Sequence, residues 1–202
     1  MIKNIIFDFG DIFIDLDKPA TANEFQKLGL KTPIEETSII DQAFEVGNIS
    51  IENFIQQYQT FLPNTTEQQI INAWNSIIKE FPIKRLDFIK QLQIDNNYRL
   101  FLLSNTNDLH IEYIKKHVTF YNDFKNCFEQ FYLSQQIGLR KPNADIYQFV
   151  LDMNKLKPSE TLFIDDTKAN TDTAAKLGLK TWNLIPGKDD VTELFNLKED
   201  LF

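Results

Sequence analysis

The sequence is poor in the residues that carry disulfide and zinc chemistry. Among its 202 residues there is one cysteine, Cys127, and there are two histidines, His110 and His117. One cysteine cannot form an internal disulfide, and these soft ligands are too few for a zinc site. We interpret both histidines as surface or packing residues. Any metal in this chain is expected to be a hard cation bound by oxygen.

The chain also lacks an excess of positive charge and any long hydrophobic run. It has 21 Lys and Arg against 29 Asp and Glu, a net charge of −8 at pH 7, so nucleic acid is not expected as a partner. The N-terminal apolar run is too short for a signal peptide or a membrane span. We therefore expect a cytoplasmic protein that binds no membrane. Its oligomeric state has no signal in the sequence.

Several catalytic signatures are missing too. The sequence has no Gly-x-Ser-x-Gly elbow, no glycine-rich phosphate loop ending in Gly-Lys-Ser/Thr, and no Gly-x-Gly-x-x-Gly fingerprint. These absences argue against a serine hydrolase of that type, a P-loop nucleotide hydrolase and a dinucleotide-binding enzyme.

Five short apolar runs are present instead, each bounded by polar or turn residues. They lie at residues 4–9, 98–103, 130–134, 161–164 and 180–182. The stretches between the later runs have helical spacing, and alternating strands and helices are typical of a parallel sheet covered on both faces. The predicted core is therefore α/β.

The long gap between the first two runs, residues 17–97, has no strand pattern. Its apolar residues recur at intervals of three and four, as in Phe54, Ile55, Tyr58 and Phe61. Thr65 or Thr66 ahead of Gln68 and Gln69 is a candidate helix start, and Ser50 is a weaker one. We expect an insertion of about four helices whose aromatic side chains form a core of their own.

Polar residues that follow the strands are the candidates for chemistry, because the carboxyl ends of parallel strands meet at one edge of a sheet. They are Asp8, Ser104, Asn105, Lys141, Asp165 and Asp166. Gathered carboxylates repel one another, and a divalent cation such as Mg²⁺ relieves that repulsion. A carboxylate beside Mg²⁺ and a lysine is a competent nucleophile toward phosphorus, with lysine and hydroxyl groups holding the phosphoryl oxygens.

Each of these residues also has a purely structural interpretation. Asp8, Ser104 and Asn105 could cap helices or form turns, and Lys141 could be a solvated loop lysine. The adjacent pair Asp165 and Asp166 is harder to explain in this way, because two acids that close a buried strand are destabilising without a partner. The joint occurrence of all these candidate residues at the ends of strands favours a catalytic site over separate structural roles.

Four segments containing these residues carry a family resemblance. In order they read IIFDFGDIFIDLD, FLLSNTN, GLRKPNADIY and TLFIDDTKAN. The chain resembles the haloacid dehalogenase superfamily, in the branch with a helical cap that includes sugar-phosphate phosphatases such as α-D-glucose-1-phosphate phosphatase. The resemblance implies a Rossmann-like doubly wound core from residues 1–16 and 88–202 and a four-helix cap from residues 17–87. It also implies Mg²⁺-dependent hydrolysis of a small phosphorylated metabolite through an aspartyl-phosphate.

The resemblance also assigns roles to the candidate residues. Asp8 would be the nucleophile and a metal ligand, with the carbonyl of Gly10 and the carboxylate of Asp166 as further ligands and Asp165 supporting the metal shell. Ser104 and the backbone of Asn105 would bind the phosphoryl group, and Lys141 would neutralise the charge of both that group and Asp8.

Two positions depart from the family pattern. Most phosphatases of the superfamily carry an acid two residues after the nucleophile, where this chain has Gly10, so the proton donor is unidentified. Asp11 is one residue further along the chain, so its side chain should point the other way and is a poor substitute. Asn170 is neutral where many relatives carry an acid.

Three alternative functions remain: a haloacid dehalogenase, a binding or regulatory relative, and a mutase. The pair Asp165 and Asp166 argues against the dehalogenase. Nothing in the sequence identifies the substrate.

Overall fold

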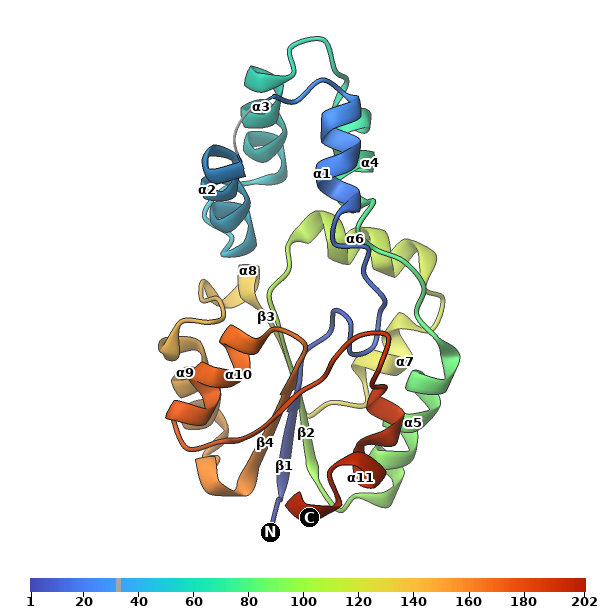
Figure 1. Ribbon diagram of the computed structural model, residues 1–202, viewed down its shortest axis with the longest axis vertical. Helices are drawn as coiled ribbons and strands as arrows, with labels where there is room; N and C mark the ends of the chain where they lie inside the picture. The colour runs from blue at the N-terminus through green and yellow to red at the C-terminus, as the bar shows by residue number, and fades with distance from the viewer. Residues whose placement is uncertain (32–33) are drawn as a thin grey trace.

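The computed structural model describes residues 1–31 and 34–202, which form an α/β part and a helical part stacked along the long axis (Figure 1). Five strands build one parallel sheet in the order β3-β2-β1-β4-β5. They are β1 (Asn4–Phe7), β2 (Arg99–Ser104), β3 (Gln130–Leu133), β4 (Thr161–Asp165) and β5 (Lys180–Asn183). The predicted doubly wound α/β fold is confirmed.

Strand β1 lies in the middle of the sheet, and its position explains why residues far apart in sequence meet. All four of its residues are buried, and Phe7 pairs with Leu102 of β2 on one side and with Ile164 of β4 on the other. Because the three strands are parallel and in register, the residues that follow them emerge at the same edge.

Alternate residues of the strands enter apolar clusters on the two faces of the sheet. On one face Ile5 and Phe7 pack with α5 (Ile83–Asp95), α6 (Asp108–His117) and α7 (Tyr121–Lys125). On the other face Ile6 and Phe163 pack with α9 (Ala144–Asn154) and α10 (Lys168–Lys176). The remaining short elements are α8 (Ser134–Ile137), η1 (Pro158–Glu160), η2 (Val191–Glu193), α11 (Leu194–Leu197) and η3 (Glu199–Leu201). No helix within the described ranges is long and apolar enough to span a membrane.

The helical part lies between β1 and α5 in sequence, and none of its described residues adds a strand to the sheet. Its helices are α1 (Ala20–Lys27), α2 (Ile34–Glu45), α3 (Ile51–Phe61) and α4 (Glu67–Asn75). Thr66 and Gln69 form a reciprocal capping box at the start of α4, and the Ser50 hydroxyl accepts a hydrogen bond from the Asn53 amide at the start of α3. The aromatic residues of these helices form their own buried cluster, as expected.

The sequence-based boundary at residue 87 falls inside α5. Leu86, Ile89 and Leu92 of this helix belong to the apolar cluster on the sheet. We therefore propose that the cap comprises α1 to α4 and that the core domain resumes just before Ile83.

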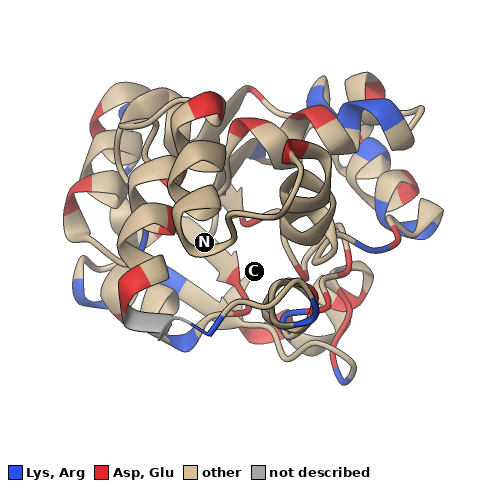
Figure 2. Ribbon diagram, turned by 90° about the horizontal axis from the view of Figure 1, so that it is seen from above, with Lys and Arg blue, Asp and Glu red and all other residues tan. Residues whose placement is uncertain are grey.

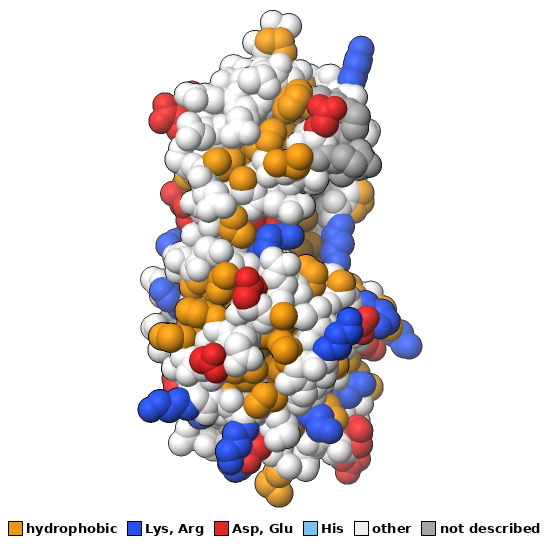
Figure 3. All heavy atoms as spheres, turned by 90° about the vertical axis from the view of Figure 1, so that its left-hand side faces the viewer, with side chains coloured by type: hydrophobic (Ala, Val, Ile, Leu, Met, Phe, Trp, Pro, Cys, Tyr) orange, Lys and Arg blue, Asp and Glu red, His pale blue; other side chains and the backbone are white. Residues whose placement is uncertain are grey.

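The helical part contacts the core on two sides at the waist of the molecule, where basic side chains lie at the surface (Figure 3). On one side the carboxylate of Glu45 in α2 pairs with Arg140 at 2.7 Å, and the Glu45 carbonyl accepts a hydrogen bond from the Ser134 hydroxyl at 2.5 Å. On the other side the indole of Trp74 in α4 donates to the Asn107 side chain at 3.1 Å and stacks on His110. The cap is thus held at both ends of its base.

His110, which stacks on Trp74, should make the unfolding free energy depend on pH. Burial lowers the pKa of His110 to about 4, so the unfolded chain binds a proton near pH 5 that the fold excludes. Excluding this proton costs the fold nothing above the unfolded-state pKa of about 6.5, where both states are unprotonated. As the pH falls from there toward 4, proton binding by the unfolded chain lowers the unfolding free energy. Between pH 7 and pH 5, wild type should lose about 1–2 kcal/mol more unfolding free energy than His110→Gln, measured by urea denaturation. Equal losses would show that His110 titrates normally.

Candidate active site

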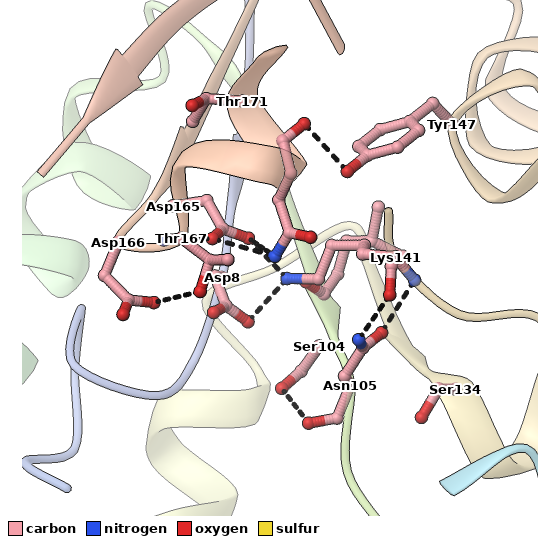
Figure 4. A network of polar contacts seen from close by, with 12 residues as sticks. Asp8, Ser104, Asn105, Ser134, Lys141, Tyr147, Asp165, Asp166, Thr167 and Thr171 are labelled. Atoms are coloured by element: carbon pink, nitrogen blue, oxygen red, sulfur yellow. Dashed lines mark hydrogen bonds and ion pairs between the residues drawn. The ribbon is translucent and has the colours of Figure 1, made fainter. Parts of the chain in front are cut away.

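Three carboxylates meet at the carboxyl edge of the sheet (Figure 4). Asp8 follows β1, Asp165 ends β4, and Asp166 follows it; each offers an oxygen, and these oxygens lie within 4.8 Å of one another. Asp165 is fully buried and Asp8 nearly so. In the view from above, acidic residues occupy strand ends near the middle of the molecule (Figure 2). The predicted convergence of Asp8, Asp165 and Asp166 is thus present in the structure.

The buried ammonium of Lys141 balances part of this negative charge. Its Nζ lies 2.8 Å from Asp8 Oδ1 and 2.7 Å from Asp165 Oδ2, and it donates a third hydrogen bond to the Leu103 carbonyl at 2.8 Å. Burial by itself lowers the pKa of Lys141, but the attraction of Asp165 and Asp8 outweighs it and raises the pKa above its usual value. Lys141 is therefore a fixed positive charge and not a solvated loop residue.

Asn105 holds Lys141 in place through its side chain. Asn105 Nδ2 donates to the Lys141 carbonyl at 2.8 Å, and Asn105 Oδ1 accepts from the Lys141 amide at 2.9 Å. Ser104 is buried beside it at the end of β2. Sequence reasoning considered only the backbone of Asn105 and missed this clamp, because 36 residues separate the two partners.

Asp165 is fully engaged by protein donors. Besides Lys141, its carboxylate accepts a hydrogen bond from the Thr167 amide at 2.8 Å, and the side-chain amide of Asn170 lies 3.0 Å from both of its oxygens. The Asn170 carbonyl in turn accepts a hydrogen bond from the Tyr147 hydroxyl. An acid at position 170 would repel Asp165, whereas the amide donates to it. The neutral residue at this position therefore stabilises the carboxylate that orients Lys141.

Asp166 forms an ion pair with a different basic residue, Lys18. Lys18 Nζ contacts Asp166 Oδ2 and also lies 3.2 Å from Asp11 Oδ2. The other oxygen of Asp11 accepts a hydrogen bond from the Leu16 amide at 3.0 Å. Lys18 lies on the connection from the core to α1, and sequence reasoning did not single it out. The sequence offered one signal, a lysine directly after the acids of the first motif.

The charge on Asp8 shows why the cluster suits a divalent cation. Burial raises the pKa of Asp8 to about 7, Lys141 opposes this rise, and Asp165 adds to it. A cation between Asp8 and Asp166 would favour the ionised form of both, and all the available donors are oxygens, as Mg²⁺ prefers. The donor set therefore fits Mg²⁺. Gly10 follows Asp8 in the same loop, and the role of its carbonyl stays a prediction.

Comparisons with known proteins agree with this geometry. The family model of haloacid dehalogenase-like hydrolases matches residues 2–178. The D-ribitol-5-phosphate phosphatase of Bacteroides thetaiotaomicron is 32% identical over 96% of this chain and 97% of its own length.

Solved structures give the same result. A haloacid dehalogenase (HAD) family enzyme of Bacteroides thetaiotaomicron was solved in complex with magnesium and inorganic phosphate. It superposes with a TM-score of 0.83 at 32% identity, covering 94% of this chain and 97% of that one. A HAD-like hydrolase of Porphyromonas gingivalis superposes with a TM-score of 0.84 at 32% identity, covering 98% of both chains. With a family match over most of its length and relatives of matching length, the chain belongs to the haloacid dehalogenase-like hydrolases.

Proposed function

We propose that this protein is a Mg²⁺-dependent phosphatase that hydrolyses a small phosphorylated metabolite through an aspartyl-phosphate on Asp8. The observation that carries the proposal is the Asp8 carboxylate, held by Lys141 at 2.8 Å and within 4.8 Å of the Asp166 ligand oxygen. Asp8, Asp166 and the Gly10 carbonyl would hold Mg²⁺, with Asp165 supporting them through Lys141. When bound, the ion would neutralise negative charge on the carboxylates and the phosphoryl group.

The residues of the chain divide the reaction between them. An oxygen of Asp8 attacks phosphorus, the bond from phosphorus to the ester oxygen breaks, and that oxygen leaves as an alkoxide that takes up a proton from water. Water then attacks the aspartyl-phosphate and releases inorganic phosphate. Lys141 stabilises the charge that develops on the phosphoryl oxygens, which Ser104 and the backbone amide of Asn105 bind.

The substrate class is supported by the relative that is 32% identical over nearly the whole chain, the D-ribitol-5-phosphate phosphatase. We propose a phosphorylated sugar or sugar alcohol of similar size as the substrate.

A substrate panel tests this function. Phosphate release should be measured from D-ribitol 5-phosphate, glucose 1-phosphate, glucose 6-phosphate and p-nitrophenyl phosphate, with Mg²⁺ and with EDTA, alongside chloride release from 2-chloropropionate. We expect phosphate release that depends on Mg²⁺ and no chloride release. Metal-independent chloride release would establish the dehalogenase alternative, and inactivity toward every ester would support the binding or regulatory relative.

Magnesium binding should also stabilise the fold. An ion that binds only the folded state at about 100 times its dissociation constant adds about 2.7 kcal/mol to the unfolding free energy. Thermal unfolding of wild type should therefore shift upward with Mg²⁺, and Asp166→Asn should lose most of that shift. Asp123→Asn is the matched control, because Asp123 is an exposed acid that pairs with Lys90 away from the carboxylate cluster. An unchanged Mg²⁺ shift in Asp166→Asn would remove Asp166 from the metal site.

A further inference from the structure

A cavity of about 400 Å³ opens between α1, α2 and α3 of the cap. This volume falls within the range of small-molecule sites, and the walls combine polar and apolar groups as such sites do. Gln26 and Phe25 of α1, Asp41 of α2 and Tyr58 of α3 contribute to the walls, and Lys18 lines the cavity as well. None of these cap residues has a role in the chemical steps described above.

Lys18 connects this cavity to the catalytic carboxylates. Its side chain lines the cavity, while its ammonium contacts Asp166 and lies 3.2 Å from Asp11. The ligand oxygens of Asp166 and Asp8 are within 4.8 Å of each other. The cavity therefore adjoins the place where the phosphorus of a substrate meets Asp8, on the side toward the cap.

Asp41 is a fixed hydrogen-bond acceptor in the cavity wall. The buried Tyr58 hydroxyl donates to Asp41 Oδ1 at 2.7 Å, and the Tyr58 ring stacks on Phe25 with centroids 4.4 Å apart. Asp41 itself lines the cavity. Burial raises the pKa of Asp41 to about 6, with Glu45 one turn along α2 adding to the rise. At pH 8 Asp41 is ionised and can only accept hydrogen bonds.

These features fit a ligand with several hydroxyl groups. An ionised carboxylate in the wall of a cavity accepts strong hydrogen bonds from hydroxyl groups. Ala22, Phe25 and Leu30, which line the cavity, supply apolar surface for carbon–hydrogen groups. Lys18 and Lys31, which also line the cavity, supply positive charge for an anionic ligand.

We propose that this cap cavity binds the polyhydroxylated alcohol part of the substrate, and that Asp41, oriented by Tyr58, accepts hydrogen bonds from its hydroxyl groups. The inference rests on the proposed phosphatase function. It makes Asp41 a specificity-determining residue that does not touch the reacting atoms, and Tyr58 a positioning residue that acts through it.

The test compares two phosphate esters that differ in their hydroxyl groups. D-Ribitol 5-phosphate and pentyl phosphate both carry a primary ester on five carbons, but only the first has hydroxyl groups beside it. KM and kcat for both, and their inhibition constants against p-nitrophenyl phosphate, should be measured at pH 8 with Mg²⁺. The proteins are wild type, Asp41→Asn, Tyr58→Phe and Glu52→Gln, the last an exposed cap acid that serves as control.

We expect wild type to prefer D-ribitol 5-phosphate. Asp41→Asn should raise KM and the inhibition constant for this ester about 10-fold, the loss of one charged hydrogen bond, and leave pentyl phosphate unchanged. Tyr58→Phe should act in the same direction with a smaller effect, and Glu52→Gln should match wild type.

Four outcomes would overturn the inference. Equal increases for both esters would mean that Asp41 only maintains the cap fold, and unchanged constants in Asp41→Asn would remove it from recognition. A wild type that does not distinguish the esters, yet hydrolyses p-nitrophenyl phosphate with Mg²⁺, would refute the cavity assignment and leave the phosphatase function standing. Failure to hydrolyse any ester would overturn both proposals.

Discussion

Asp8→Asn is expected to lower the rate of phosphate ester hydrolysis by at least about 10⁴-fold, because the amide that replaces the carboxylate is not a nucleophile. The loss should be the same for aryl phosphates and for sugar phosphates, since both need the aspartyl-phosphate. Lys141 keeps its contact with Asp165 at 2.7 Å in this variant, so the charge that binds the phosphoryl group stays in place. Steady-state phosphate release and binding of inorganic phosphate measure the two effects separately.

A matched control for this variant lies in the same loop. Asp15 is an acid seven residues further, and its half-exposed carboxylate pairs with Arg85 at 2.7 Å, away from the cluster. Asp15→Asn changes the net charge equally and should retain nearly full activity. If Asp8→Asn keeps more than about one part in a hundred of the wild-type rate, water or another residue performs the attack and the nucleophile assignment fails.

The parts of this molecule that could be predicted from sequence are those set by local patterns. Each buried strand is an apolar run, and the polar residue at its end marks the catalytic edge, so the sequence alone predicts Asp8, Ser104 and Asp165. The capping box of Thr66 and Gln69 depends on residues only three apart. The neutral Asn170 was noticed as a departure, but only its contacts with Asp165 explain it.

The parts that could not be predicted depend on contacts between distant segments. Trp74 meets Asn107 across 33 residues and Lys18 meets Asp166 across 148, and both contacts follow from how the cap sits on the core. The Tyr58 and Asp41 pair joins two cap helices whose packing angle no local pattern encodes. Sequence reasoning therefore located the chemistry at the strand ends and left the recognition of the substrate open.

Gly10 stands two residues after Asp8, at the position where most phosphatases of the superfamily carry an acid. Asp11 does not replace it, because one of its oxygens accepts a hydrogen bond from Leu16 and the other pairs with Lys18. Without a positioned acid the alcohol must leave as an alkoxide, and such an acid is typically worth about 10²- to 10⁴-fold in rate. Wild type should therefore hydrolyse p-nitrophenyl phosphate and glucose 1-phosphate faster than glucose 6-phosphate, whose primary alcohol is a poorer leaving group.

Introducing the acid tests this explanation against a variant with the same steric change. A Cβ atom at position 10 would lie 2.6 Å from Leu16 Cδ1, so both Gly10→Ala and Gly10→Asp must move the end of that flexible side chain. Relative to Gly10→Ala, we expect Gly10→Asp to raise kcat/KM for glucose 6-phosphate by up to about 10²-fold and to change p-nitrophenyl phosphate little. The acid can also activate water in the second step, so any initial burst of p-nitrophenol seen with Gly10→Ala should shrink. Equal effects of Gly10→Asp on both esters, or equal wild-type rates across leaving groups, would mean that another group already supplies the proton.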